Sequence, residues 1–552
     1  MRFLNGLYKY SLVLLVSSAI GYLVACTSQT KVENAAVRGQ QSASRINKPN
    51  VILIFADDIS AREFEIYKSS KWSGFRGKTV NDPDKLAKTP VLNQIAEQGV
   101  YIENAWAATV CSSSRAMMMT GQYASEHKWW HNKDYGQIKE GNKMRSVRLY
   151  ETSPLQIGHI AKKAGYKSIW VGKTQMGHST DHALYGFDEG VFTPGINYPE
   201  LSPHTSFGVL AKKINGKRVL YNNDSGDALK EWGYVQQPWY WMPNVQLMNH
   251  PNAKSSLEYW PNTKESIKNF GVNSYGPDIE LDFIFDFMER QHKANTPFFV
   301  YHTTHLGHDA FDYLNPESKD KWPGTPKIKW DGKQYHRTEP NITGSKGNYE
   351  LNGSVTESGI DTHIEYLDYQ IWQYLNKLKE MGIENDTILI FTADNGTSGY
   401  GKHVHHKQRG THVPLVIYAP GAKMTKQGKQ PIIASIADIM PTLADIAGVS
   451  IPDDYPVDGV SLWPYLTTNK NKHRDWIYAY KKDLTLIRGH KVMKDGDDVW
   501  WDVSQTPDDL DSFSKIMDWS AVSEAHRAER DKLKSVLPKY DIYHTEHDPV
   551  IK

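Results

Sequence analysis

Almost continuous apolar runs mark the strands that this chain is expected to form. The first run, Asn50–Ala56, ends at two aspartates and has the length and composition of a strand buried on both faces of a sheet. Similar runs predict strands at 100–107, 167–172, 297–303, 387–392 and 413–418. Between them, apolar residues at helical spacing predict helices at 89–99, 153–165, 279–291 and 359–382. Because strands and helices alternate, we predict an α/β fold with a large, mixed, mostly parallel sheet sandwiched by helices.

Two stretches interrupt this alternation, and a third pattern replaces it near the C-terminus. Residues 193–273 are rich in Trp, Tyr, Pro and Asn, and residues 311–358 are loop-like, so we interpret both as insertions into an N-terminal domain that spans 49–448. After residue 449, short strands are expected at 476–480, 484–488 and 499–503, with a helix near 520–537. We therefore predict a smaller, antiparallel C-terminal subdomain over 449–552.

The first 48 residues have the layout of an export signal followed by a tether. Two basic residues precede an apolar run at 11–25 that is too short for a confident transmembrane helix. The run ends in Leu-Val-Ala-Cys, which resembles a bacterial lipobox and implies lipid attachment at Cys26 after removal of residues 1–25; the alternative is an ordinary cleaved signal. Residues 26–48 are polar, as a flexible tether would be. We expect an exported lipoprotein of the bacterial cell envelope, anchored to the outer membrane.

The charge, aromatic content and cysteine count of the chain bear on which classes of function are possible. The 552 residues carry 64 Lys and Arg against 63 Asp and Glu, so there is no bulk positive charge for non-specific nucleic-acid binding. Aromatic residues make up 12% of the chain, which fits either an aromatic core or rings that stack on sugars. Only two cysteines are present, so Cys111 is the one cysteine beyond the expected lipid-attachment site and has no other to pair with. A single cysteine in an exported protein is either accidental or functional.

Polar residues follow the predicted strands at their carboxyl ends, where ligands collect in open α/β sheets. Asp57 and Asp58 follow the first strand, and Asp394 and Asn395 follow the strand at 387–392. Three histidines, 302, 305 and 308, accompany the strand at 297–303. Carboxylate and amide oxygens suit Ca²⁺ or Mg²⁺, although either pair alone would be ordinary turn chemistry. Two such pairs favour a divalent metal site.

The segment Cys111-Ser-Ser-Ser-Arg115, followed by an apolar turn and Thr-Gly, resembles the signature of the type I sulfatases of the alkaline phosphatase-like superfamily. In that family the cysteine is oxidised to formylglycine, whose hydrate is the nucleophile. The resemblance extends along the chain to Asp57-Asp58, Gly172-Lys173, the strand before His308, Asp394-Asn395-Gly396 and Lys402. It implies one Ca²⁺ held by Asp57, Asp58, Asp394, Asn395 and the modified Cys111, with catalytic roles for Cys111, Arg115, Lys173, His308 and Lys402.

The chemistry of a sulfate ester agrees with this assignment. Its negative charge repels nucleophiles, so hydrolysis requires cations around the sulfate and a preorganised attacking oxygen. Arg115, Lys173 and Lys402 would supply positive charge, and a helix that starts at the serine run would direct its N–H groups at the anion. A sugar alkoxide is a poor leaving group, so a general acid is required, and His308 is our candidate.

The chain departs from the family pattern at several positions. Ser113 stands where the signature has Pro or Ala, which bears on how efficiently the cysteine is converted. Gln175 replaces the histidine of the family's Lys-x-His, and His178 lies too far along to be a good substitute. Lys402 is preferred to Lys407 as the family's second lysine. His403, His405 and His406 are expected to line the pocket wall or surface, or alternatively to form a basic rim for an anionic polymer. A zinc site is the poorer interpretation, because no cysteine or carboxylate joins them.

The sequence thus predicts a sulfatase that acts on sulfated oligosaccharides or polysaccharides, with algal polysaccharide fragments as first candidate and glycosaminoglycan or mucin sulfates as second. Its expected partners are a formylglycine-generating or anaerobic sulfatase-maturating enzyme and, through the lipid, a membrane. Two alternatives stay open: a phosphodiesterase or phosphonate monoester hydrolase of the same superfamily, and a non-catalytic glycan-binding lipoprotein.

Overall fold

The computed structural model describes residues 48–192, 209–222, 245–253, 255–260, 275–308, 326–339, 342–345, 348–351 and 359–548. The predicted signal, the tether and the lipidation residue Cys26 lie outside these ranges, as do large parts of the two predicted insertions. In the described part of the chain, no helix is both long and apolar enough to cross a membrane.

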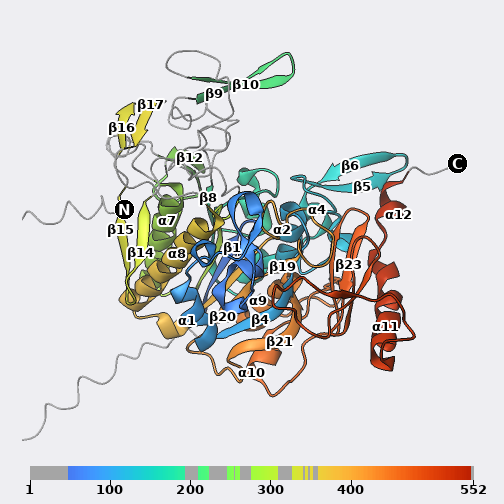
Figure 1. Ribbon diagram of the computed structural model, residues 1–552. Helices are drawn as coiled ribbons and strands as arrows, with labels where there is room; N and C mark the ends of the chain where they lie inside the picture. Colours follow the sequence, from blue (N-terminus) through green and yellow to red (C-terminus); the bar gives the residue numbers. More distant parts are fainter. Residues whose placement is uncertain are drawn as a thin grey trace, which may run out of the picture. The chain divides into compact units, whose positions relative to one another are not determined.

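A large mixed sheet forms the centre of the fold (Figure 1). Among the described residues it has eleven strands, ten of which follow one another in the order β12 (Leu257–Trp260), β11 (Val245–Met248), β8 (Glu189–Phe192), β7 (Lys167–Gly172), β13 (Phe298–Thr303), β1 (Asn50–Ala56), β18 (Thr387–Ala393), β20 (Leu415–Tyr418), β4 (Val100–Trp106) and β19 (His412–Val413). The eleventh, β21 (Gly428–Ser435), pairs with β4. The central strands from β8 to β18 run parallel, whereas β12, β11 and β20 pair antiparallel with their neighbours. The predicted fold class is therefore confirmed.

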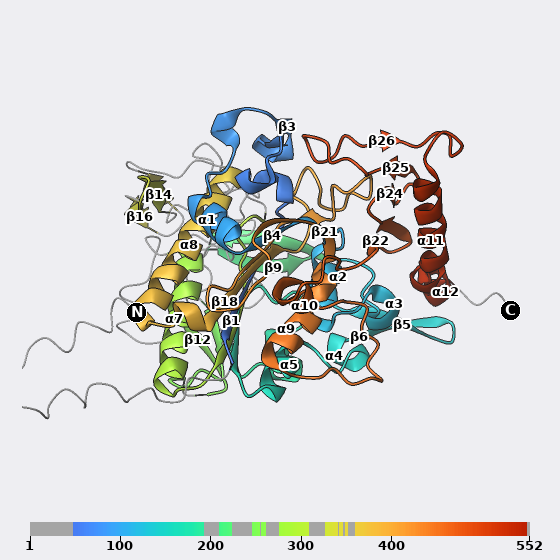
Figure 2. The ribbon, with the colours of Figure 1, turned by 90° about the horizontal axis from the view of Figure 1, so that it is seen from below.

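Helices cover both faces of this sheet, as Figure 2 shows. On one face, α8 (Ile360–Met381) packs between α1 (Pro90–Gln98) and α7 (Gly276–Lys293). On the other face, α9 (Ile439–Ala447) packs against α2 (Cys111–Thr120) and α5 (Ile157–Lys163). The strands β1, β13 and β18 are buried along their whole length and mostly apolar because both of their faces are covered.

The C-terminal part forms a second sheet, as expected. It contains β22 (Ile477–Lys481), β23 (Leu484–Arg488), β24 (Val492–Lys494), β25 (Trp500–Asp502) and β26 (Ser514–Lys515), all antiparallel. Two helices follow, α11 (Glu524–Tyr540) and α12 (Tyr543–His547). The O–H of Tyr480 in β22 donates to the carbonyl of Ser113 in α2 over 3.4 Å. This contact joins the smaller sheet to the helix that begins at Cys111.

Short elements complete the described chain. Five hairpins lie outside the two sheets: β2 (Trp72–Ser73) with β3 (Thr79–Val80), β5 (Gly136–Glu140) with β6 (Lys143–Val147), β9 (Val209–Ile214) with β10 (Lys217–Asn222), β14 (Lys327–Trp330) with β15 (Tyr335–Thr338), and β16 (Ile342–Ser345) with β17 (Asn348–Leu351), counting the described residues only. The remaining α-helices named in the described chain are α3 (Ala124–His127), α4 (Leu149–Thr152) and α10 (Trp463–Thr467).

Candidate active site

Two neighbouring parallel strands carry the acidic residues predicted to bind a metal. In the register of β1 with β18, Ala56 lies opposite Ala393. Asp57 and Asp394 therefore follow the two strands at the same edge of the sheet. The backbone N–H of Asp58, whose φ of 56° is in the left-handed region, donates to Oδ1 of Asp394 over 3.0 Å. The sheet thus brings together carboxylates that are more than three hundred positions apart in the sequence.

Cys111 is the first residue of α2 and lies beside these carboxylates. Its Sγ is 3.8 Å from Oδ1 of Asp57 and 3.6 Å from Oδ1 of Asp58. Burial raises the pKa of the thiol well above its ordinary value, and the charge of Asp394 raises it further. The unmodified thiol is therefore protonated at neutral pH and is a poor nucleophile.

Arg115 and Lys173 neutralise part of this negative charge. Nη2 of Arg115 donates to Oδ2 of Asp394 over 2.8 Å and lies 3.6 Å from Oδ2 of Asp57. Nζ of Lys173 also donates to Oδ2 of Asp57. Burial opposes the ionisation of Asp57, but the positive charges around it, Lys173 first, hold its pKa well below the ordinary value. Asp57 is therefore a charged carboxylate in a buried site, where such a group requires partners of opposite charge.

Lys402 and His308 lie together beside Asp58. Nζ of Lys402 donates to Oδ2 of Asp58 over 2.7 Å and lies 3.0 Å from Nε2 of His308. The imidazole Nε2 is itself 3.9 Å from the same carboxylate oxygen. The histidine predicted as general acid and the preferred lysine therefore share a hydrogen bond at the edge of the carboxylate cluster.

The donor atoms fit a divalent cation. One ligand atom from each of Asp57, Asp58, Cys111 and Asp394 lies within 4.8 Å of the others. Asn395 donates from Nδ2 to Oδ1 of Asp58 over 2.8 Å, while its buried Oδ1 accepts no hydrogen bond from the described residues. Burial and the charge of Asp57 raise the pKa of Asp394 to about 6. A hard cation among these oxygens would relieve that repulsion and would give Asn395 Oδ1 a partner.

The three histidines near β13 have different environments. His302 is inside the strand rather than after it, and its Nδ1 lies 3.1 Å from the O–H of Tyr374 in α8. His305 is buried, and burial together with the charge of Lys173 lowers its pKa well below the ordinary value. His305 is thus a neutral imidazole beside the site, to which the sequence analysis assigned no role. The sequence signal that could have indicated a role for His305 was its position three residues before His308.

Gln175 contacts the start of the cysteine helix through Asn132. Oδ1 of Asn132 accepts hydrogen bonds from the backbone N–H of Ser112, from Oγ of Ser112 and from Nε2 of Gln175, each over 3.2 Å. His178 is exposed at the beginning of a 3₁₀ turn. The neutral amide of Gln175 therefore lies near the N-terminus of α2. The type I sulfatases that this chain resembles have a histidine at this position. Nothing in the sequence indicated that Asn132 would join it.

The loop after Lys402 is tied to the C-terminal subdomain by carboxylates, which corrects the expectation that no carboxylate joins its histidines. Nε2 of His405 lies 3.0 Å from Oδ1 of Asp497, and Nδ1 of His406 lies 3.4 Å from Asp495 and from Asp497. These acids come from the turn between β24 and β25, so the contact was hidden by sequence distance. Asp495 also accepts the indole N–H of Trp501 over 2.8 Å. We interpret the cluster as the anchor of this loop.

Lys407 does not enter the site. Its Nζ lies 4.8 Å from the centre of the Trp501 ring, a cation–π contact in the C-terminal subdomain. Of the two lysines, Lys402 lies beside Asp58 and Lys407 packs against Trp501.

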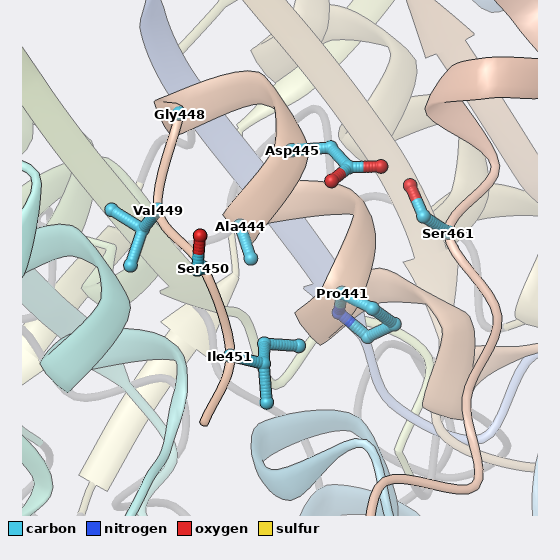
Figure 3. Close-up of a pocket in the computed structure, with 8 residues that line it drawn as sticks. All are labelled: Pro441, Ala444, Asp445, Gly448, Val449, Ser450, Ile451 and Ser461. Atoms are coloured by element: carbon cyan, nitrogen blue, oxygen red, sulfur yellow. The ribbon is translucent and has the colours of Figure 1, made fainter. Parts of the chain in front are cut away.

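A separate pocket lies at the C-terminal end of α9 (Figure 3). It has a volume of about 380 Å³, and its lining residues are Pro441, Ala444, Asp445, Gly448, Val449, Ser450, Ile451 and Ser461. None of these is a predicted site residue or contacts the carboxylate cluster in the described chain. The chemistry is therefore concentrated at the strand ends and not in this pocket.

Comparison with known proteins decides the family. The family model described as Sulfatase matches residues 49–449, which is more than half of the chain. The chain belongs to the sulfatase family. This sulfatase is thus an enzyme that hydrolyses sulfuric esters, and the family implies a formylglycine and a bound metal.

Curated relatives are similar over most of this sulfatase. A sulfatase of Formosa agariphila is 23% identical and covers 82% of this chain and 76% of its own length. An arylsulfatase of Clostridium perfringens is 24% identical, with 89% of this chain and 94% of the relative covered. An N-acetylgalactosamine-6-O-sulfatase of Bacteroides thetaiotaomicron is 25% identical and covers 85% of this chain and 84% of its own.

Solved structures confirm the fold. The crystal structure of Ps i-CgsB has a TM-score of 0.55 at 19% identity and covers 91% of this sulfatase and 94% of its own chain. The putative sulfatase yidJ from Bacteroides fragilis has a TM-score of 0.54 at 17% identity, with 91% and 98% covered. Each match spans 91% of this sulfatase, so its large mixed sheet with a smaller C-terminal sheet is the architecture of known sulfatase structures.

Proposed function

We propose that this sulfatase hydrolyses sulfate esters of carbohydrates and uses a formylglycine made from Cys111 together with Ca²⁺. The observation that carries the proposal is the position of Cys111, at the first residue of α2 and within 4 Å of Asp57 and Asp58. A buried cysteine of structural type would be surrounded by apolar side chains. Here the thiol faces carboxylates and cations, which is the environment that an anionic substrate and a divalent metal require.

Conversion of Cys111 to formylglycine supplies the nucleophile that the protonated thiol does not provide. The hydrated aldehyde of formylglycine provides an oxygen nucleophile and a second hydroxyl through which the aldehyde is regenerated. The buried thiol cannot replace it, because its raised pKa leaves little thiolate at neutral pH. Ser113 is in the first turn of α2, where its side chain is buried, so it is presented to a maturation enzyme only before the helix has folded.

Ca²⁺ would be held by Asp57, Asp58, Asp394 and Asn395 with the modified residue 111. When bound, it would neutralise the carboxylates and polarise a sulfate oxygen. The oxygen-only character of the four side chains favours Ca²⁺ over a transition metal. With their carboxylates bound to the cation, Lys173 and Lys402 would become available to hold the sulfate oxygens, and Arg115 would add a third positive charge to the site.

His308 is proposed to protonate the leaving oxygen of the sugar. Its Nε2 lies 3.0 Å from Nζ of Lys402, so a proton can be held between the two groups. A positioned acid lowers the barrier most when the leaving group is a strong base, as a sugar alkoxide is. His308 would therefore matter for sugar sulfates more than for aryl sulfates.

The proposed substrates are sulfated oligosaccharides, with algal polysaccharide fragments ahead of glycosaminoglycan fragments. Relatives named after sugars support the general class: one is an N-acetylgalactosamine-6-O-sulfatase, and a structure of Ps i-CgsB is in complex with k-i-k-neocarrahexaose. The similarity to a sulfatase of Formosa agariphila and to Ps i-CgsB leads us to test algal fragments first. Lipid attachment at Cys26 would keep the enzyme at the cell envelope, where released fragments are captured; membrane partitioning that survives in a Cys26→Ser variant would contradict this part.

The test is sulfate release by the full chain coexpressed with a formylglycine-generating enzyme. Mass spectrometry of the peptide that contains Cys111 should show the loss of one sulfur and two hydrogens and the gain of one oxygen. Ion chromatography should then detect sulfate released from at least one of a panel of sulfated oligosaccharides, and 4-nitrophenyl sulfate should be hydrolysed in preference to 4-nitrophenyl phosphate. Preference for the phosphate would identify a phosphoesterase, and a converted chain inactive on both would identify a binding protein.

A further inference from the structure

A cationic side chain of the C-terminal subdomain reaches the wall of the active site. Nζ of Lys481 lies 3.4 Å from the backbone carbonyl of His403, the residue that follows Lys402. The N–H of His403 donates to the carbonyl of Thr109 over 2.9 Å, two residues before Cys111. His403 therefore connects Lys481 with the segment that precedes Cys111 and with the loop that carries Lys402.

The backbone around Lys481 is held on both sides. The preceding residue, Tyr480, donates its O–H to the carbonyl of Ser113 in α2, over 3.4 Å. The following residue, Lys482, donates its backbone N–H to the carbonyl of Trp130 over 2.7 Å. Trp130 is completely buried. Figure 2 shows the strand β22 beside the helices α2 and α3. The ammonium group is thus presented by a fixed strand end rather than by a free loop.

Lys481 has no acidic partner among the described residues. Burial and the charge of Lys482 lower its pKa, with no carboxylate acting in the opposite direction. The nearest acid in the sequence, Asp483, lies 3.6 Å from Nε2 of His544 instead. Within the described chain, Lys481 differs in this respect from Lys173 and Lys402, each of which is paired with a carboxylate of the metal cluster.

The imidazole of His403 lies near both Lys402 and Lys481. Burial and the charges of Lys481 and Lys402 lower the pKa of His403, which shows that both lysines act on the same exposed imidazole. Both lysines therefore lie near His403: Lys402 is paired with Asp58 of the carboxylate cluster, and Lys481 comes from the C-terminal subdomain.

We propose that Lys481, with His403 beside it, binds a second anionic group of the substrate, a sulfate or a carboxylate next to the sulfate that is removed. The inference rests on the proposed function, since it assumes that the first anion occupies the site at Cys111. If the inference holds, the preferred substrates are oligosaccharides that carry at least two anionic groups. Lys481 is a specificity residue and takes no part in bond cleavage.

The experiment uses ligands that need no knowledge of the sugar. Calorimetry on the full chain compares alkane disulfonates of increasing length with alkane monosulfonates of the same length. At the best length, the disulfonate should bind about three- to fivefold more tightly, as expected for one partly exposed ion pair. The advantage should shrink at high salt. Sulfonate-carboxylates of the same length show whether a carboxylate serves as well as a sulfate.

Variants decide whether Lys481 is responsible. The advantage should vanish in Lys481→Met and persist in Lys481→Arg, while monosulfonate binding stays unchanged. Lys379→Met is the matched control, because this exposed lysine in the last turn of α8 lies near the start of β18, at the opposite edge of the sheet from Asp394. A disulfonate that never exceeds its monosulfonate, or an advantage that survives in Lys481→Met, would overturn the inference. Failure of the proposed function would show separately, as absent sulfate release.

Discussion

At the residue scale, the site is a set of mutually neutralising charges. The buried carboxylates of Asp57, Asp58 and Asp394 are matched by the buried cations Arg115 and Lys173 and by the partly buried Lys402. Cations that are already paired with carboxylates cannot also hold a sulfate well. A divalent ion on the acidic side chains would solve this problem, because it would free the lysines for the substrate. The same residues would then serve both metal binding and sulfate binding.

Replacing His308 by alanine should separate two kinds of substrate. We expect the kcat for a sugar sulfate to fall by about 10²–10⁴, since the alkoxide then leaves without a proton. The kcat for 4-nitrophenyl sulfate should change far less, because nitrophenolate is a good leaving group. Steady-state kinetics on both substrates measures the difference. Equal losses on the two would reject His308 as the general acid.

At the scale of elements, the turn after β13 positions the histidine. Gly307 has a φ of 105°, and a Cβ on it would lie 2.1 Å from the carbonyl oxygen of Asp57. The backbone N–H of Asp57 in turn donates to the carbonyl of Leu306 over 3.4 Å. The turn therefore packs directly on the strand end that carries the metal ligands. A glycine is required there for space as well as for conformation.

Gly307→Ala should lower both stability and activity, and Gly382→Ala is its control. Gly382 also has a positive φ, 69°, but no atom lies within 4 Å of a Cβ placed on it. The control should cost about 1 kcal/mol of unfolding free energy for backbone strain alone. Gly307→Ala should cost more and should reduce kcat, because Asp57 and His308 are displaced. Denaturant unfolding and kinetics test this; equal effects in the two variants would contradict it.

Sequence patterns predicted the elements whose burial is uniform and missed those that are irregular. The fully buried, mostly apolar strands β1, β13 and β18 were predicted nearly to the residue. The strand β21 was missed because it contains Pro431, and its register with β4 shifts between Gln430 and Ile433. The run at 413–418 was predicted as one strand, but Pro414 divides it into β19 and β20.

The predicted site residues lie together because parallel strands end at one edge, which a sequence pattern can indicate. Contacts made by the C-terminal subdomain gave no such signal. Asp495 and Asp497 meet the histidines of the loop after Lys402 from about ninety positions away, and Lys481 approaches His403 from 78. Only the packing of two separate sheets determines these pairs.

At the scale of the whole molecule, the buried neutral histidine His127 joins the two parts. Nε2 of His127 lies 2.8 Å from the O–H of Tyr480 in the C-terminal sheet, and its Nδ1 accepts the N–H of Trp129 over 3.0 Å. Burial lowers the pKa of His127 to about 3 and that of His412 to about 4. Both imidazoles must therefore lose their protons when the chain folds.

These histidines make the protein less stable in acid. Between about pH 6.5 and pH 4 the unfolded chain binds more protons than the folded chain at both positions, so the unfolding free energy falls as the pH falls. Urea denaturation at pH 7 and pH 5 measures the change. In His127→Gln, which keeps a hydrogen-bonding side chain without the titrating ring, the difference between the two pH values should be smaller. An unchanged difference would show that His127 does not contribute.

The most direct measurement compares sulfate release with the chemical state of residue 111. Preparations that contain different fractions of formylglycine, together with Cys111→Ala, are assayed on the same sulfated oligosaccharide, and their folding is checked by thermal unfolding. We predict a rate proportional to the formylglycine fraction and no turnover by the folded alanine variant. Equal turnover in all preparations, or full turnover by Cys111→Ala, would contradict the assignment of Cys111 as the source of the nucleophile.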